Sequence, residues 1–319
     1  MSVWMRLAVI LLVVTSTAAN AGSISRRIDV HGQARTYALY VPAASEGKPA
    51  ALVIALHGGL GQGRSMEALS GFSQLADREG FLVAYPDGLR RRWRDGRTMP
   101  AGMVAEEADD VAFMSALIDD AARLHALEAH RIYVTGISNG AIFANYLALK
   151  LSDRIAAIAP VAGGIATAVA ADFHPASPVS VLIINGREDP LVPYEGGAVG
   201  KTHGSIVSTE RALHLWLDAD DLHGEPHVRN VAAKKTGDCS EQWLSWSDGR
   251  NGSAVTRVAL AGGGHTWPGG MQYLPKAIVG AVCTELDASR AIWDFFRQHP
   301  KPPGRSPSAP EAMDGRERP

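Results

Sequence analysis

Short apolar runs alternate with helix-like segments from about residue 51 to residue 217, and this alternation limits the possible folds more than any other feature. A continuous apolar run favours a strand buried on both faces, whereas apolar residues that recur every three or four positions favour a helix. Strands that alternate with helices build a mostly parallel sheet with helices on both faces. The sequence therefore predicts the α/β class. The expected strands span 51–56, 81–84, 132–135, 155–159 and 179–184, and the expected helices begin at 109 and span 138–151 and 211–217.

Two strand-rich segments and a last helix flank this alternating region. Residues 28–41 favour a hairpin at a sheet edge, with its turn at His31 and Gly32. The stretch 228–260 is also strand-like, and 286–296 has the pattern of a closing helix. Because no internal repeat and no Pro/Ser/Gly-rich linker divides this region, we expect one domain over residues 22–299.

Both ends of the chain differ from the region between them. Arg6 precedes an apolar run over residues 7–14, and small residues follow up to Ala19-Asn20-Ala21, which is the pattern of a cleaved signal peptide over residues 1–21. The apolar run is shorter than the roughly 20 residues that span a bilayer, so we expect no membrane span after cleavage and a secreted or periplasmic protein. Residues 300–319 are rich in Pro, Arg, Glu and Gly, which favours a disordered tail.

Charge and cysteine content exclude several kinds of partner and site. The net charge of −2 gives no reason to expect nucleic acid as a partner. Cys239 and Cys283 are the two cysteines of the chain, and in an oxidising compartment we expect them to form a disulfide, with two buried thiols as the alternative. No Cys/His cluster has the spacing of a zinc site, and we expect no metal and no cofactor.

A G-x-S-x-G motif, Gly136-Ile137-Ser138-Asn139-Gly140, lies between an apolar strand and a helix. This setting is that of the nucleophile elbow in the α/β-hydrolase fold, where a sharp turn lifts a serine hydroxyl above the sheet. Side chains two residues either side of the serine would clash with neighbouring backbone, and Gly136 and Gly140 remove them. Ser138 is therefore the candidate nucleophile, and a helix-capping serine in an ordinary turn is the alternative.

A serine nucleophile needs a general base and an acid that orients it, and the hydrolase fold supplies them in the order Ser, Asp/Glu, His. Asp189 follows the expected strand 179–184, with its neighbour Glu188 as a competing acid. His265 lies on the glycine-rich loop 262–270, which is poorly suited to packing and favours close approach to other backbone. We therefore predict a Ser138–His265–Asp189 triad.

Two backbone amides are candidates for the oxyanion hole. One belongs to Asn139, directly after the candidate nucleophile, and the other to the loop after the first central strand. In that loop Gly59 is the expected donor, with Leu60 as the alternative.

Three aromatic side chains near these loops are candidates for substrate binding. Trp93 and Trp267 would stack on an aromatic acyl group or hold a polyester chain, and His57 begins the oxyanion loop. Ordinary packing is the alternative for both tryptophans. The arginine-rich loop 90–94 would attract an acidic polymer end, or it is simply a solvated charged loop.

Seven motifs occur in an order that resembles the polyhydroxybutyrate-depolymerase/feruloyl-esterase family of secreted α/β-hydrolases. The resemblance covers residues 27–297, and its most specific element is the loop 262–270. Ala141 departs from the family pattern, where a second glycine is usual, and so does the basic loop 90–94. The motifs are Leu56-His57-Gly58, Tyr85-Pro86-Asp87-Gly88, Asp109-Asp110-Val111-Ala112-Phe113, Gly136-Ile137-Ser138-Asn139-Gly140, Asn185 through Asp189, Gly262 through Gly270, and Ile292-Trp293-Asp294-Phe295-Phe296.

The resemblance implies a secreted serine esterase with the same triad. Its members act on polyhydroxyalkanoates, on feruloyl or acetyl esters of polysaccharide, or on small aryl esters, so an ester is the expected partner molecule. No separate adsorption module is visible, which favours soluble esters or oligomers over polyester granules. The alternatives are a serine peptidase on the same scaffold and a binding protein that has kept the fold without the activity.

Overall fold

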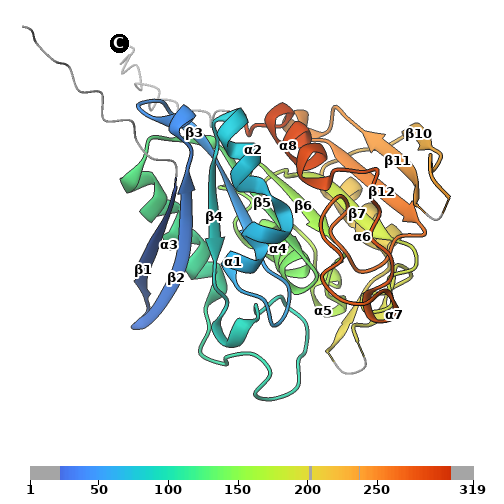
Figure 1. Cartoon of the computed structure of the whole chain (residues 1–319), viewed down its shortest axis with the longest axis horizontal. Helices are drawn as coiled ribbons and strands as arrows, with labels where there is room; N and C mark the ends of the chain where they lie inside the picture. The colour runs from blue at the N-terminus through green and yellow to red at the C-terminus, as the bar shows by residue number, and fades with distance from the viewer. Residues whose placement is uncertain (1–21, 201–202, 237, 303–319) are drawn as a thin grey trace, which may run out of the picture.

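The computed structural model describes residues 22–200, 203–236 and 238–302, which form a sheet with helices on both faces (Figure 1). The strands of this sheet are β1 (Gly22–Val30), β2 (Gln33–Val41), β3 (Ala50–Leu56), β4 (Leu82–Pro86), β5 (Leu127–Ile137), β6 (Ala157–Val161), β7 (Ser180–Gly186), β10 (His227–Val231), β11 (Ser240–Trp246) and β12 (Val255–Ala261). The helices are α1 (Gly63–Ser70), α2 (Phe72–Glu79), α3 (Asp110–Leu124), α4 (Asn139–Lys150), α5 (Thr167–Ala170), α6 (Thr209–Ala219), α7 (Lys276–Val279) and α8 (Ala288–Gln298).

The sheet has ten strands in the order β1-β2-β4-β3-β5-β6-β7-β12-β11-β10. The central strands from β4 to β12 all pair in parallel, and the outer strands join through antiparallel pairs. A separate short hairpin joins β8 (Gly197–Ala198) and β9 (Ser205–Ile206). The predicted α/β fold with a mostly parallel sheet is therefore confirmed.

Each face of the sheet has its own hydrophobic core, because successive side chains of a strand point to opposite faces. In β3, Leu52, Ile54 and Leu56 join one core, and the residues between them join the other. Helices α3, α4 and α6 cover the first face, whereas α1, α2 and α8 cover the second (Figure 1). Burial on both faces explains why β3 is an apolar run without alternation.

The predicted edge hairpin is confirmed, and one pair of helices was not expected. The β1–β2 turn lies at His31 and Gly32, whose φ angles are 53° and 81°. Helices α1 and α2 fill the segment between β3 and β4, for which the sequence predicted no element. Each has only eight residues, and Gly71 separates them in the left-handed region with φ 63°, so the helical pattern is too short to recognise.

The predicted signal peptide and most of the predicted tail lie outside the described residues. The first residues of that tail are held to the domain, because the backbone N–H of Lys301 donates to the His130 carbonyl at 2.7 Å and its Nζ donates to the carbonyls of Ile155 and Pro178. In the described part of the chain, no helix is both long and apolar enough to cross a bilayer.

The predicted Cys239–Cys283 disulfide is present, with a Cα–Cα distance of 5.3 Å. It joins the segment before β11 to the segment between α7 and α8. The Cys283 sulfur packs against Gly263, which lies two residues before His265. The disulfide therefore joins these two segments next to the loop that carries the candidate base.

Candidate active site

The three candidate triad residues follow strands that end at the same edge of the sheet. Ser138 comes directly after β5, Asp189 follows β7, and His265 follows β12. These strands are parallel and, with β6 between β5 and β7, adjacent in the sheet. Their carboxyl ends therefore deliver all three loops to one edge.

Ser138 lies in a strained turn between β5 and α4. Its φ of 59° and ψ of −122° are rarely adopted by a residue with a side chain, and such strain is typical of functional sites. A Cβ added at Gly136 would lie 2.8 Å from the Leu56 carbonyl oxygen, and one at Gly140 would lie 2.6 Å from the carbonyl oxygens of Leu56 and His57. Both glycines of the motif therefore lie so close to the backbone of residues 56 and 57 that a side chain would clash.

Ala141, which departs from the family pattern, is accommodated by a neighbouring glycine. A Cβ on Gly163, just after β6, would overlap the Ala141 Cβ. The Ala141 methyl group therefore occupies the space that Gly163 leaves, and the departure changes packing at the start of α4.

The candidate base and acid form a buried pair. His265 Nδ1 lies 2.7 Å from Asp189 Oδ2, and the two side chains are 4% and 2% exposed. The other carboxylate oxygen of Asp189 accepts the backbone N–H groups of Leu191 and Val192, both at 2.8 Å. The competing acid, Glu188, accepts the Gly262 N–H instead. Asp189, and not Glu188, is thus the carboxylate that pairs with the His265 imidazole.

Backbone contacts hold His265 in place as well. Its N–H donates to the Val279 carbonyl at 2.5 Å, and its carbonyl accepts the Tyr273 hydroxyl at 2.8 Å. A Cβ on Gly264 would overlap the Val279 oxygen, which explains a glycine directly before the histidine. Within the described residues, no hydrogen bond joins Ser138 Oγ to the His265 ring.

Hydrogen bonds near Ser138 discriminate between the amides of Gly59 and Leu60, the two candidate oxyanion donors of this loop. The Leu60 N–H donates to the Arg91 carbonyl at 2.8 Å and is therefore occupied. The N–H groups of Gly59 and Asn139 have no acceptor among the described residues. A Cβ on Gly59 would lie 3.8 Å from the Asn139 Cβ, so the two segments are adjacent. This geometry favours Gly59 over Leu60.

The Asn139 side chain has a role that the sequence did not suggest. Its Oδ1 accepts the Trp93 N–H at 2.8 Å, and its Nδ2 donates to the Trp93 carbonyl and to Asp95 Oδ2. Asp95 in turn is held by Arg97, with an Nη2–Oδ2 distance of 2.6 Å. Asn139 occupies a variable position of the G-x-S-x-G motif, so the pattern carries no signal for this contact.

The structure corrects the expected substrate contacts of the aromatic residues. Trp93 is fully buried, stacks on Phe143 with ring centroids 5.4 Å apart, and donates its indole N–H to the His57 carbonyl. Trp267 is 1% exposed and donates to Ser289 Oγ. Neither indole has an exposed face on which a ligand could stack. Both belong to the core because their flanking loops fold over the sheet.

His57 is also a structural residue. Its ring Nε2 accepts the Gly88 N–H at 3.0 Å, and its Nδ1 lies 2.7 Å from the Gly58 carbonyl oxygen, to which it donates. Burial lowers the pKa of His57, so the ring is neutral. Since both ring nitrogens are occupied, His57 fixes the oxyanion loop against residue 88 and has no group left for substrate.

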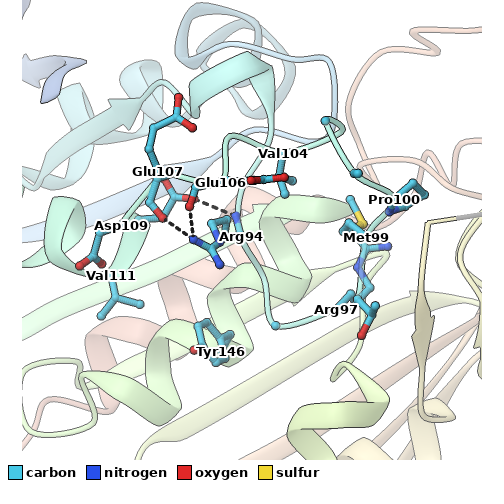
Figure 2. Close-up of a pocket in the computed structure, with 16 residues that line it drawn as sticks. Arg94, Arg97, Met99, Pro100, Val104, Glu106, Glu107, Asp109, Val111 and Tyr146 are labelled. Atoms are coloured by element: carbon cyan, nitrogen blue, oxygen red, sulfur yellow. Dashed lines mark hydrogen bonds between the residues drawn. The ribbon is translucent and has the colours of Figure 1, made fainter.

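A cavity of about 640 Å³ lies beneath the loop that follows Trp93 (Figure 2). Arg94 reaches across this loop and donates to the backbone carbonyls of Glu106 and Ala108. Tyr146 of α4 also lines the cavity. None of the three candidate triad residues is among the described residues that line it, so it is separate from their site.

Sequence comparisons place the chain in a family of esterases. Residues 35–202 match the family model described as esterase PHB depolymerase. NocK of Nocardia uniformis subsp. tsuyamanensis, whose name classes it with the esterases, is 31% identical over 87% of this chain and 83% of its own length. Feruloyl esterase B of Piromyces equi is 27% identical over 68% of this chain, and the match spans only 40% of that enzyme.

Among solved structures, an acetyl xylan esterase from Aspergillus awamori shares the fold. The TM-score is 0.53, and the match covers 73% of this chain and 89% of that one. At 15% identity, this likeness concerns the fold alone.

Proposed function

The chain belongs to the esterase PHB depolymerase family of carboxylic-ester hydrolases, and from that premise we propose that it cleaves esters with a Ser138–His265–Asp189 triad. The observation that carries the proposal is the buried His265–Asp189 pair, 2.7 Å apart, on loops that leave the same sheet edge as the strained Ser138. A carboxylate on Nδ1 leaves Nε2 as the base that faces the reaction.

In the proposed mechanism, His265 accepts the Ser138 proton while the serine oxygen attacks the ester carbonyl. Asp189 holds the imidazole tautomer and stabilises the imidazolium that forms. The amides of Gly59 and Asn139 donate to the developing oxyanion, and each such donor typically contributes about 3–4 kcal/mol in the transition state. The imidazolium then protonates the departing alcohol. Water releases the acid from Ser138 by the same steps in the second half-reaction.

The proposed substrates are hydroxyalkanoate oligomers or feruloyl and acetyl esters of polysaccharide. The support is the chain's kinship with enzymes named feruloyl esterase and acetylxylan esterase and with a poly(3-hydroxyalkanoate) depolymerase. Hydrolysis of methyl ferulate, acetylated xylan and hydroxybutyrate oligomers by the purified protein discriminates among these classes.

We also propose that the protein is exported. The Cys239–Cys283 disulfide supports this, because structural disulfides persist in oxidising compartments. Expression of the full chain in a bacterium, followed by fractionation and N-terminal sequencing, should find the mature protein outside the cytoplasm and starting at residue 22. A protein retained in the cytoplasm at full length contradicts the proposal.

Labelling with a fluorophosphonate probe tests the nucleophile. We expect the wild-type protein to be labelled and Ser138→Ala to lose both labelling and esterase activity. Ser25→Ala, on an exposed position of β1, is the matched control and should label like the wild type. Labelling that survives Ser138→Ala refutes the assigned nucleophile. Hydrolysis of peptide arylamides in preference to aryl esters would instead favour a peptidase.

A further inference from the structure

One arginine beside the proposed oxyanion hole has no use in the mechanism described so far. The position that a Cβ would occupy on Gly59 lies 3.0 Å from Arg92 Nη1 and 3.8 Å from the Asn139 Cβ. The Arg92 guanidinium therefore lies against the residue whose amide, with that of Asn139, is proposed to bind the oxyanion.

Arg92 differs from its charged neighbours because, among the described residues, its side chain has no hydrogen-bond or ion-pair partner. Arg97 is bound by Asp95 through several hydrogen bonds, and Arg94 donates to loop carbonyls (Figure 2). The Arg92 side chain is half-buried, yet within the described residues it has neither an ion-pair partner nor a hydrogen-bond acceptor. Such a cation is costly to bury unless an anion joins it.

The electrostatics around Arg92 point the same way. Burial is the main cause that lowers the pKa of Arg92, the positive charge of Arg97 adds to it, and Asp95 opposes it. Burial, together with the charges of Arg92 and Arg97, also lowers the pKa of His203. Among the described residues, the positive charge of Arg92 is thus left unbalanced, because the Asp95 carboxylate is already bound by Arg97.

We infer that the Arg92 guanidinium binds a carboxylate of the substrate, so that the enzyme prefers esters with a free carboxylate a few bonds from the scissile carbonyl. This inference rests on the proposed function. The planar guanidinium presents paired N–H donors that match the two oxygens of a carboxylate. The carboxylate could come from either half of the ester: the acyl half, as in a half-ester of a dicarboxylic acid, or the alcohol half, as in an acylated hydroxy acid.

Two matched substrate pairs test the inference and distinguish its sources. The first is p-nitrophenyl hemisuccinate against p-nitrophenyl butyrate, with the charge on the acyl half. The second is β-acetoxybutyrate against β-acetoxybutyramide, with the charge on the alcohol half. For at least one pair, we expect Arg92→Gln to lower the ratio of kcat/KM, charged over neutral, by about tenfold or more, and Arg92→Lys to restore part of it.

Salt and a distant arginine provide the controls. Added NaCl should lower the charged-to-neutral ratio of the wild type and leave that of Arg92→Gln unchanged. Arg64→Gln, on an exposed position of α1, should leave both ratios as in the wild type. If Arg92→Gln lowers kcat/KM equally for charged and neutral esters, Arg92 acts on the oxyanion or on the loop, and the inference is refuted. An unchanged ratio refutes it as well. Failure of the proposed function can be told apart from failure of this inference, because Ser138→Ala would then keep esterase activity.

Discussion

Replacing Asp220 with asparagine should stabilise the protein at neutral pH by about 3 kcal/mol. Asp220 follows α6 at the edge of the sheet opposite to the candidate active site, and it is fully buried. Its Oδ1 accepts the Val179 N–H at 3.3 Å, whereas its Oδ2 has no partner among the described residues. Ser253 lies near the carboxyl without completing a hydrogen bond, and its own Oγ is unpaired in the same set of residues.

The size of the effect follows from the pKa of this carboxyl. Burial raises the pKa of Asp220 from 3.8 to about 6, against the opposing effects of Ser253, Val179 and the nearby cations. The folded protein therefore keeps the proton up to about pH 6, while the unfolded chain releases it near 3.8. The free energy of unfolding falls as the pH rises through this interval and stays lower above it. The two pKa values correspond to about 3 kcal/mol at pH 7.

Asparagine avoids that loss because its amide is neutral at every pH. Its carbonyl keeps the Val179 contact, and its N–H₂ group is placed to donate to Ser253. Denaturant unfolding of wild type and Asp220→Asn, at about pH 4 and about pH 7.5, measures the effect. We expect a small difference at the lower pH and a gain for the variant at the higher pH.

The matched control is Asp172→Asn, whose side chain is 92% exposed and should change stability little at either pH. A variant that is less stable than the wild type at pH 7.5 would show that the carboxylate is ionised and held by the neighbouring cations, and the reasoning would be refuted. A gain that is equal at both pH values would also contradict it.

Three further predictions concern the site and its supports. Asp189→Asn should lower kcat on an aryl ester by roughly 10⁴-fold with an unchanged circular dichroism spectrum, because the imidazole would adopt the other tautomer; a loss under tenfold contradicts this role. Gly140→Ala should lower the free energy of unfolding by about 1–3 kcal/mol, since its Cβ would lie 2.6 Å from the Leu56 carbonyl oxygen, and a melting temperature equal to that of the wild type would argue against that contact. Replacing Cys239 and Cys283 by serine should cost about 4 kcal/mol for this separation of 44 residues in denaturant unfolding, and no loss would mean that the rest of the fold already restrains both segments.

The sequence identified those features whose causes are local or topological. The elbow at Ser138 needs only a strand, a helix and two glycines that avoid the backbone of β3, and all of these are visible in the chain. The parallel sheet was predictable because its strands are apolar without alternation. The pairing of Asp189 with His265 then followed from the chain order Ser, Asp/Glu, His of the hydrolase fold.

Features that depend on packing between distant segments could not be predicted from the sequence. An aromatic residue on a loop is equally suited to the core and to a substrate pocket, and the burial of Trp93 depends on Phe143 and His57, which lie far away in the chain. The choice between Gly59 and Leu60 depends on one carbonyl, that of Arg91. The isolated guanidinium of Arg92 is recognisable only once the partners of its neighbours are known.

Asn139 connects the proposed oxyanion hole to the loop that begins at Trp93. Its backbone amide is the one proposed to bind the oxyanion. Its side chain forms hydrogen bonds with the loop segment from Trp93 to Asp95. Any change that displaces this loop, including one selected to recognise a new ester, would also displace the amide that is proposed to stabilise the transition state. Evolution of substrate choice here is therefore tied to catalytic rate, and variants with altered preference should often be slow until a second substitution restores the loop.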